Sequence, residues 1–303
     1  MMRRVGLLAL AMVALATPAL VTLPAAALTV TDQTGRAVTL AAPPRRIVSL
    51  VPGVTEMVFA IGAEERLVGV TDFCDYPAAA RKKRSVGGML APSLETLVAL
   101  RPDLVVATDS GNTDETRTQL ERLRLPVYLV SPRGIVDVFR TMEQLGALTG
   151  QSARAAEAVA GLERRVRAVA ERVAARRRPR VLYVVWPEPL IVPGRGAAVT
   201  ELIELAGGAS VTANAAEGYP RWSVESAVAG APELIVLAQH GAGTSPLSRE
   251  KWERFAGLPA IRAGRIHNVD GDLFHRFGPR VVDALEILAR LVHPEAFVSQ
   301  ERR

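Results

Sequence analysis

Hydrophobic residues recur with helical spacing along residues 151–178. Ala155, Val159, Leu162, Val166, Val169 and Val173 are separated by alternating steps of four and three residues, which places them on one face of a helix. Ser152 is a suitable N-cap and Pro179 ends the pattern. About 26 residues would give a helix of about 39 Å. We interpret it as a rigid backbone helix joining two lobes; a long helix inside one α/β domain is the alternative.

Short apolar segments alternate with amphipathic segments on both sides of this helix. The sequence predicts a hairpin at 28–42, followed by strands at 46–50, 67–70, 104–107, 127–130, 181–186, 234–237 and 266–269. Helices are predicted at 52–63, 92–101, 114–124, 135–148, 198–205, 224–229, 248–255 and 279–292. Strands alternating with helices predict an α/β fold, with parallel sheets covered by helices on both faces.

A repeat indicates that the two halves are similar. The residue types at 93–95, 98–99 and 102–106 recur at 223–225, 228–229 and 232–236, so every position is offset by 130. We therefore predict an N-terminal α/β lobe at 28–149, a linking helix at 150–178 and a C-terminal α/β lobe at 179–303. Small ligands bind preferentially between such lobes.

The first 27 residues have the pattern of a secretory signal peptide. Arg3 and Arg4 precede an almost wholly apolar segment at 5–21, and residues 24–27 offer small side chains for cleavage. A transmembrane anchor is the alternative. No cysteine lies near the cleavage site, so we expect no lipid anchor, and no later segment has the length of a membrane helix. The mature protein is predicted to be exported and soluble.

Composition and motifs argue against several functions. The chain has 303 residues, of which 49% are hydrophobic and 22% charged, and its formal net charge is +6. Its arginine clusters contain no interleaved aromatics, so nucleic-acid binding is not favoured. The four histidines have no metal-ligand spacing, the single cysteine, Cys74, excludes an internal disulfide, and no nucleophile elbow or Walker loop is present. We expect no enzymatic activity, although an exported hydrolase or a structural domain remains an alternative.

Two groups of residues carry the candidate chemistry. Aromatic residues fall in predicted loops at strand ends, where they could form platforms for a flat apolar ligand or simply fill the core below. They are Phe73, Tyr76, Trp186, Tyr219, Trp222 and Phe274. Glu95 and Glu225 occupy matching first turns of two helices. Each could stabilise its helix dipole, and the matched pair also suits docking onto arginines of a symmetric partner.

Several segments together resemble a known family. VSLVPGVTEMVFAIG, VGVTDFCDYP, APSLETLVALRPDLVVA, ELIELAGG and GDLFHRFGPRVVDALEILARLVHPE are similar to the periplasmic binding proteins for cobalamin and iron–siderophores, and closest to the cobalamin branch. The resemblance implies two α/β lobes joined by one long helix with limited hinge motion. It implies a periplasmic protein, expected as a monomer, that captures a corrinoid or, alternatively, haem or a ferric siderophore. The partner would be the permease dimer of an ABC importer, and no cofactor or resident metal is implied.

The resemblance also implies roles for individual residues. Phe73 and Tyr219 match aromatic ligand contacts, whereas Met89, Thr108 and Ile191 stand where a cobalamin-binding relative has aromatics. Glu95 and Glu225 match permease-docking glutamates, and His275 replaces an acid. The ligand-binding residues predicted are Phe73, Met89, Thr108, Trp186, Ile191, Tyr219, Trp222, Asp272, His275 and Arg276, with Arg280 as a further polar contact. A metal ligand at His275 or Cys74 is a hypothesis; a loop histidine and a small buried residue are the ordinary interpretations.

Overall fold

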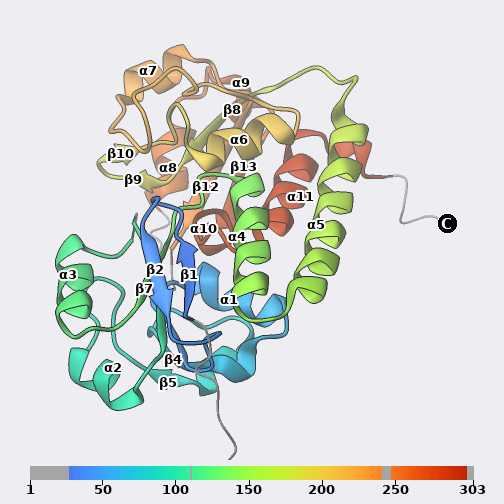
Figure 1. The fold of residues 1–303 in the computed structure, drawn as a ribbon. Helices are drawn as coiled ribbons and strands as arrows, with labels where there is room; N and C mark the ends of the chain where they lie inside the picture. The colour runs from blue at the N-terminus through green and yellow to red at the C-terminus, as the bar shows by residue number, and fades with distance from the viewer. Residues whose placement is uncertain (1–26, 110, 241–246, 299–303) are drawn as a thin grey trace, which may run out of the picture.

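The computed structural model describes residues 27–109, 111–240 and 247–298 (Figure 1). The strands before the long helix are β1 (Leu28–Thr31), β2 (Ala37–Leu40), β3 (Ile47–Ser49), β4 (Leu67–Val70), β5 (Arg84–Ser85), β6 (Leu104–Thr108) and β7 (Val127–Val130). The helices there are α1 (Pro52–Ala60), α2 (Leu94–Leu100), α3 (Asp114–Arg122) and α4 (Ile135–Leu148), and the long helix is α5 (Ser152–Val173).

The second half repeats this alternation. Its strands are β8 (Arg180–Val184), β9 (Trp186–Pro187), β10 (Leu190–Ile191), β11 (Ala209–Ser210), β12 (Leu234–Gln239) and β13 (Ile266–Asp270). Its helices are α6 (Ala198–Leu205), α7 (Val224–Ala229), α8 (Leu247–Glu253), α9 (Pro259–Arg262), α10 (Gly271–His275) and α11 (Val281–Val292). Short 3-10 helices occur at Glu64–Arg66, Ala78–Lys82 and Pro294–Ala296.

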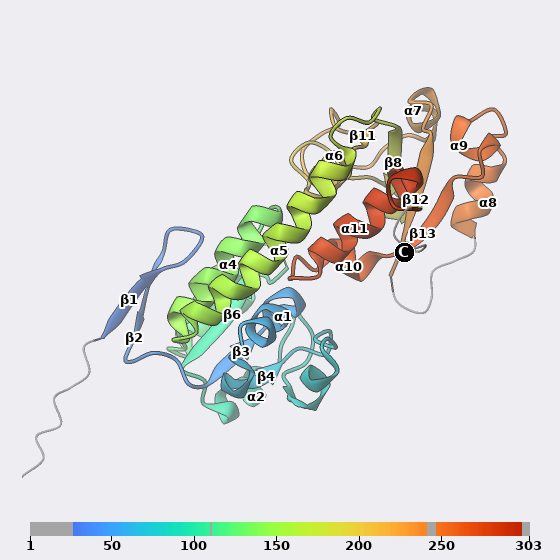
Figure 2. The same cartoon turned by 90° about the vertical axis from the view of Figure 1, so that its right-hand side faces the viewer.

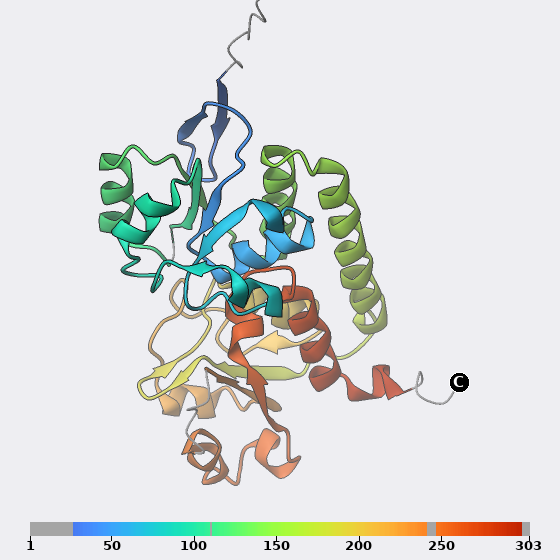
Figure 3. The same ribbon diagram turned by 90° about the horizontal axis from the view of Figure 1, so that it is seen from below.

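Each lobe is built on one parallel sheet. The N-terminal sheet has the order β5-β4-β3-β6-β7 and the C-terminal sheet the order β11-β8-β12-β13. The central strands are rich in Val, Leu and Ile, and all five residues of β6 are buried, as expected for strands covered on both faces. The predicted fold class is confirmed: there are two α/β lobes, and Figure 3 shows the long helix α5 running along one side of both. The residue limits of the lobes stay a prediction.

The repeat in the sequence corresponds to a repeat in the structure. Helices α2 and α7 begin at residues 94 and 224, and strands β6 and β12 begin at residues 104 and 234, so both offsets are 130. In each half a serine caps the helix. Ser93 accepts a hydrogen bond from the amide of Thr96 at 3.2 Å, and Ser223 accepts one from the amide of Ser226 at 3.0 Å.

Helix α5 packs against both lobes. Figure 2 shows it running beside α4 and then beside α11. Ala155, Val159, Val169 and Val173 on its apolar face are buried. Ala155, Val159 and Val169 belong to one hydrophobic cluster that also contains residues of α1 and β6 from the first lobe and of β12 and α11 from the second. The lobes therefore share a continuous core along this side.

The predicted limits of α5 were partly wrong. The helix has 22 residues, which corresponds to roughly 33 Å, and it ends at Val173 instead of Arg178. Arg178 instead donates hydrogen bonds to the carbonyl of Gly208 at 2.9 and 3.0 Å. The N-cap is Gln151, without a side-chain cap bond, whereas Ser152 is the first helical residue.

The remaining elements follow the predictions with some additions. The hairpin of β1 and β2 is present as an antiparallel pair, and α6 and α7 have the predicted limits. The short strands β9 and β10 and the helices α9 and α10 were not predicted, because each has too few residues to show a period. Residues 1–26 of the predicted signal peptide lie outside the described residues. Within the described part of the chain, no helix combines the length and apolarity needed to cross a bilayer.

Candidate functional site

A cavity of about 930 Å³ lies between the lobes, where strands of both sheets end. Its lining includes Val51 after β3, Thr108 and Val130 at the ends of β6 and β7, and Val185 after β8. Ligands of open α/β sheets bind outside the carboxyl ends of the strands. The fold therefore brings loops of both lobes to one site.

The wall from the N-terminal lobe is mainly apolar. Val54 and Met57 of α1 line it together with Phe73 and Met89. Phe73 follows β4 in the loop 71–77 and exposes 54% of its surface. A large apolar side chain that is so exposed beside a cavity is available to pack against a ligand.

The wall from the C-terminal lobe contains an aromatic cluster. Tyr219 and His275 line the cavity, with ring centroids 6.1 Å apart in an edge-to-face arrangement. His275 also stacks on His240 at 5.1 Å and contacts Tyr183. Burial, with a smaller effect of His240, lowers the pKa of His275 to about 4. Burial raises the pKa of Tyr219 to about 12. At neutral pH the cavity therefore presents a neutral imidazole and a protonated phenol.

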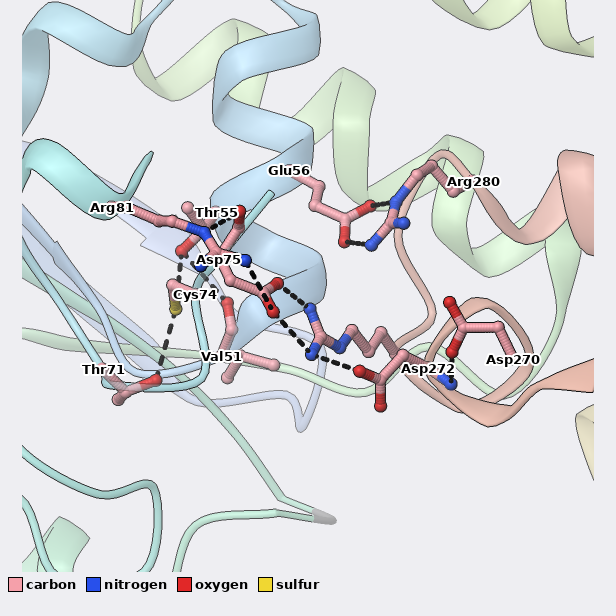
Figure 4. A network of polar contacts seen from close by, with 11 residues as sticks. Val51, Thr55, Glu56, Thr71, Cys74, Asp75, Arg81, Asp270, Asp272 and Arg280 are labelled. Atoms are coloured by element: carbon pink, nitrogen blue, oxygen red, sulfur yellow. Dashed lines mark hydrogen bonds and ion pairs between the residues drawn. The ribbon is translucent and has the colours of Figure 1, made fainter. Parts of the chain in front are cut away.

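Charged groups lie at the edge of the cavity. Arg276 pairs with Asp75 and, at 2.6 Å, with Asp272, so its guanidinium contacts two carboxylates (Figure 4). A hydrogen bond from Arg276 holds the pKa of Asp75 below its usual range. Arg133 pairs with Asp109 at 2.8 Å. The charges of both arginines are thus compensated within the protein.

The structure brings most of the predicted ligand-binding residues together. Those that line the cavity are Phe73, Met89, Thr108, Tyr219, Asp272, His275 and Arg276. Trp186, Ile191 and Trp222 are not among its lining residues. Their assignment to the ligand, like that of the other seven, stays a prediction.

The three residues outside the lining have identifiable contacts. Trp186 on β9 pairs with Ile191 on β10, and its indole donates a hydrogen bond to the carbonyl of Glu188 at 2.9 Å. Trp222 packs against the second hydrophobic cluster of the C-terminal lobe. Phe274 is fully buried and packs on Tyr183. For Trp222 and Phe274, filling the core is the interpretation that the structure supports.

Sequence reasoning missed several lining residues. Arg133, Glu217 and Phe277, as well as Val54 and Met57, line the cavity but were not predicted to do so. Val54 and Met57 have the apolar spacing of any helix facing a core, so nothing distinguished them. Arg133 lies three residues after the end of β7, and this position was the one available signal, because site residues follow strand ends. Arg280, predicted as a polar contact, is absent from the lining and pairs with Glu56.

Glu95 and Glu225 occupy equivalent positions in the two lobes. Each is exposed and lies in the first turn of its helix, α2 or α7. These helices lie at opposite ends of the molecule (Figure 1). Two carboxylates so far apart cannot share one small ligand, but both can contact a large partner.

The described residues contain no cluster of three or more His, Cys, Asp or Glu side chains that could hold a metal ion. Cys74 is buried, and its sulfur is 3.2 Å from the hydroxyls of Thr55 and Thr71. Burial raises the pKa of its thiol. In the described structure Cys74 is thus a small buried side chain within the loop 71–77.

Comparisons with known proteins agree with this geometry. The chain is 32% identical over 243 residues to the vitamin B12-binding protein of Salmonella typhimurium, covering 80% of this chain and 88% of that protein. The crystal structure of the periplasmic vitamin B12-binding protein of Vibrio cholerae has a TM-score of 0.74 at 24% identity, covering 86% of this chain and 99% of that one. A periplasmic haem-binding protein from Pseudomonas aeruginosa has a TM-score of 0.73 at 29% identity, with 83% and 93% covered. The family model for periplasmic binding proteins matches residues 47–273. The chain therefore belongs to the periplasmic binding protein family and is a substrate-binding protein of the ABC transporter type.

Proposed function

We propose that this protein captures a corrinoid such as cobalamin in the cavity between its lobes and delivers it to the permease of an ABC importer. The observation that carries the proposal is the cavity itself. It measures about 930 Å³, near the upper end of the roughly 300–1,000 Å³ typical of small-molecule sites. A bare metal ion or a single amino acid would leave most of this volume unfilled.

The chemistry of the walls supports a large, flat ligand with polar edges. Phe73 comes from the N-terminal lobe and Tyr219 from the C-terminal lobe, so each face of a planar ring system could meet one aromatic side chain. Arg133, Glu217 and Asp272 provide polar atoms for the amides or carboxylates at the ring edge. The similarity to the vitamin B12-binding protein of S. typhimurium favours a corrinoid within this class.

Haem is the second candidate, and one observation favours it. His275 lines the cavity and has a pKa of about 4, so its imidazole is neutral at physiological pH. A neutral imidazole is a good ligand for iron that has an open axial position. The similarity to the haem-binding protein of P. aeruginosa supports the same alternative.

Titration of the purified mature protein distinguishes these ligands. Cyanocobalamin, haemin and a ferric siderophore are added separately, and binding is followed by tryptophan fluorescence and by the visible spectrum of each ligand. Saturable 1:1 binding that is tightest for cyanocobalamin supports the corrinoid proposal. Tightest binding of haemin, with a spectral change that His275→Gln removes, supports the alternative. Binding of none of them excludes the whole ligand class.

We further propose that the mature protein acts in the periplasm after removal of residues 1–27 and that Glu95 and Glu225 contact arginines of the permease dimer. The N-terminal sequence pattern supports export. The equivalent exposed positions of the two glutamates support docking onto a partner with two-fold symmetry. Mass spectrometry of protein purified from the periplasm would show whether the chain begins near residue 28.

A further inference from the structure

The loop 71–77, which carries Phe73, is anchored to its own lobe by Cys74. The Cys74 sulfur is 3.2 Å from the hydroxyls of both Thr55 and Thr71, and its side chain is buried. Phe73 itself is exposed toward the cavity. The position of its ring therefore depends on how the residues on either side of it are held.

The other side of the loop is held from both lobes. Arg81 of the N-terminal lobe donates a hydrogen bond to the carbonyl of Asp75 at 3.2 Å and pairs with its carboxylate at 3.7 Å. Arg276, the residue after α10, pairs with Asp75 and donates a second hydrogen bond to it at 3.4 Å. The guanidinium of Arg280 lies 3.9 Å from the ring centre of Tyr76, in the geometry of a cation–π contact. Two arginines of one lobe thus contact the two residues that follow Cys74 in the other.

Both arginines are themselves fixed. Asp272 accepts a hydrogen bond from Arg276 at 2.6 Å, and Glu56 of α1 accepts two from Arg280 at 2.6 and 2.9 Å (Figure 4). The side chain of Glu56 is only 3% exposed, so this two-pronged pair is desolvated. Charge-assisted pairs with this geometry define orientation as well as contributing energy.

We propose that Arg276 and Arg280 are positioning residues through which the C-terminal lobe sets the position of Phe73, the aromatic platform of the N-terminal lobe. This inference rests on the proposed function, because it takes Phe73 as a ligand contact. Separation of the lobes at this edge breaks the Arg276–Asp75, Arg280–Tyr76 and Arg280–Glu56 contacts together. The loop then keeps the contacts within its own lobe and loses those from the C-terminal lobe. Opening of the lobes and loosening of the ligand platform are thus one event, which couples ligand release to the lobe angle.

Cys74 provides a reporter for the loop in the ligand-free protein. It is the single cysteine of the chain and is buried, so a thiol reagent such as DTNB reacts only when the loop opens. The rate of labelling is compared for wild type, Arg276→Gln and Asp75→Asn. Arg165→Gln is the matched control, because Arg165 also pairs with two carboxylates, Asp283 and Glu286, but away from the loop.

We expect Arg276→Gln and Asp75→Asn each to increase the labelling rate by about tenfold or more, because either change releases the same contact. The double variant should gain little beyond either single variant. Arg165→Gln should stay within about twofold of wild type. Wild-type rates in both single variants would overturn the proposal. The proposal would also be overturned if the labelling rates of the variants rose only in proportion to the fraction of unfolded protein, as measured by urea denaturation.

Arg280→Lys tests the effect on ligand binding. Arg280 does not line the cavity, and lysine keeps the charge beside Glu56 while losing the planar fork and the stacking on Tyr76. We expect faster Cys74 labelling and affinity for cyanocobalamin reduced by roughly tenfold. Faster labelling with unchanged affinity would overturn the link to Phe73. If wild type binds no tetrapyrrole at all, the proposed function fails, and the labelling rates alone decide whether the arginines hold the loop.

Discussion

Phe73 illustrates how a single residue can point to a candidate binding site. It exposes 54% of its surface, although water contact of an aromatic ring is unfavourable by itself. The fold accepts this exposure because the adjacent Cys74 is buried and anchors the loop. Tyr219 of the C-terminal lobe is also an exposed aromatic residue, with 40% of its surface accessible. In the proposed function, a bound ligand would cover both rings and relieve this unfavourable exposure.

Replacing these rings should weaken ligand binding. Burial of a large apolar side chain contributes about 1.5–3 kcal/mol, so we expect Phe73→Ala and Tyr219→Ala each to raise the Kd roughly 10- to 100-fold. Leu123→Ala is the control, since Leu123 is similarly exposed, at 43%, but lies outside the cavity lining. Fluorescence titration with cyanocobalamin and with haemin measures the change. Equal affinities for Phe73→Ala and Leu123→Ala would show that Phe73 is not a platform.

The partly buried imidazole of His275 should make stability depend on pH. Its pKa is about 4 in the folded protein and near 6.5 in the unfolded chain. As the pH falls from 6.5 toward 4, the unfolded chain binds a proton that the folded protein does not, so stability decreases. The loss at pH 4 is up to about 3 kcal/mol, and above pH 7 there is none.

The variant His275→Gln isolates this effect. Urea denaturation between pH 7.5 and 4.5 gives the free energy of unfolding of wild type and variant. Their difference should be constant above pH 7 and should shift in favour of the variant as the pH falls. Glu56, whose carboxyl pKa is raised by burial, acts in the opposite direction but is present in both proteins and cancels. A difference that does not change with pH would contradict the burial of a neutral His275.

The sequence allowed individual site residues to be proposed, but not the direction of their side chains or their long-range pairings. Phe73 and Tyr219 could be proposed as candidates because aromatic residues are scarce and these two fall in predicted loops, whereas His275 was proposed from the family resemblance. Trp222 has the same signals but packs in the core, since the direction of a loop side chain depends on tertiary contacts. The ion pair of Arg280 with Glu56 joins residues 224 positions apart, and no local pattern encodes such a pairing.

At the scale of elements, the beginning of α1 is a close junction between the lobes. A Cβ atom added to Gly53 would lie 2.0 Å from the carbonyl oxygen of Arg276 and 3.0 Å from that of Phe277. Phe277 itself has a φ of 46°, a left-handed conformation that non-glycine residues rarely adopt. Helix α1 and the segment after α10 can approach so closely only because residue 53 has no side chain.

The variant Gly53→Ala should therefore destabilise the protein. The obstructing atoms belong to the backbone and cannot rotate away, so we expect a loss of about 1–3 kcal/mol in the free energy of unfolding. Gly88→Ala is the control, because an added Cβ there meets nothing within 4 Å, and it should change stability by less than about 0.5 kcal/mol. Urea denaturation followed by circular dichroism compares the two. Equal stabilities would show that the lobes are not in tight contact at α1.

Helix α5 shows which properties of an element are local. Its apolar face was evident from spacing, because a period of 3.6 residues is a property of the sequence itself. The end of the helix at Val173 could not be predicted from the sequence, because the arginines that follow are good helix formers. They are Arg176, Arg177 and Arg178. Their guanidinium groups bind Glu295, Glu233 and the carbonyl of Gly208 in the folded protein. Tertiary contacts thus set the boundary.

At the scale of the whole molecule, the continuous core and the paired lobes suit a receptor that moves little. One hydrophobic cluster extends from the first sheet through α5 to the second. Relative motion of the lobes therefore has to distort packed side chains, in addition to breaking the ion pairs at the cavity edge. If lobe opening is small, the two end helices, α2 and α7, keep a nearly constant separation.

A constant separation matters if Glu95 and Glu225 dock together on a permease dimer. We expect the double variant Glu95→Arg/Glu225→Arg to abolish uptake, because each new arginine would repel the arginine proposed to meet it. Ligand affinity should not change, since neither residue lines the cavity. Uptake of labelled cobalamin is measured in cells whose own copy is replaced by the variant, and affinity is measured by titration.

The matched control reverses two other exposed acids, one in each lobe. Glu115 in α3 and Glu250 in α8 are exposed and lie outside the lining of the cavity, so Glu115→Arg/Glu250→Arg makes the same change in net charge. If docking depends on specific positions, this control retains uptake while the Glu95/Glu225 variant loses it. Equal loss in both would indicate a general effect of net charge. Full uptake by Glu95→Arg/Glu225→Arg would exclude these helices as the docking sites, because two reversed charges at a true interface cost several kcal/mol.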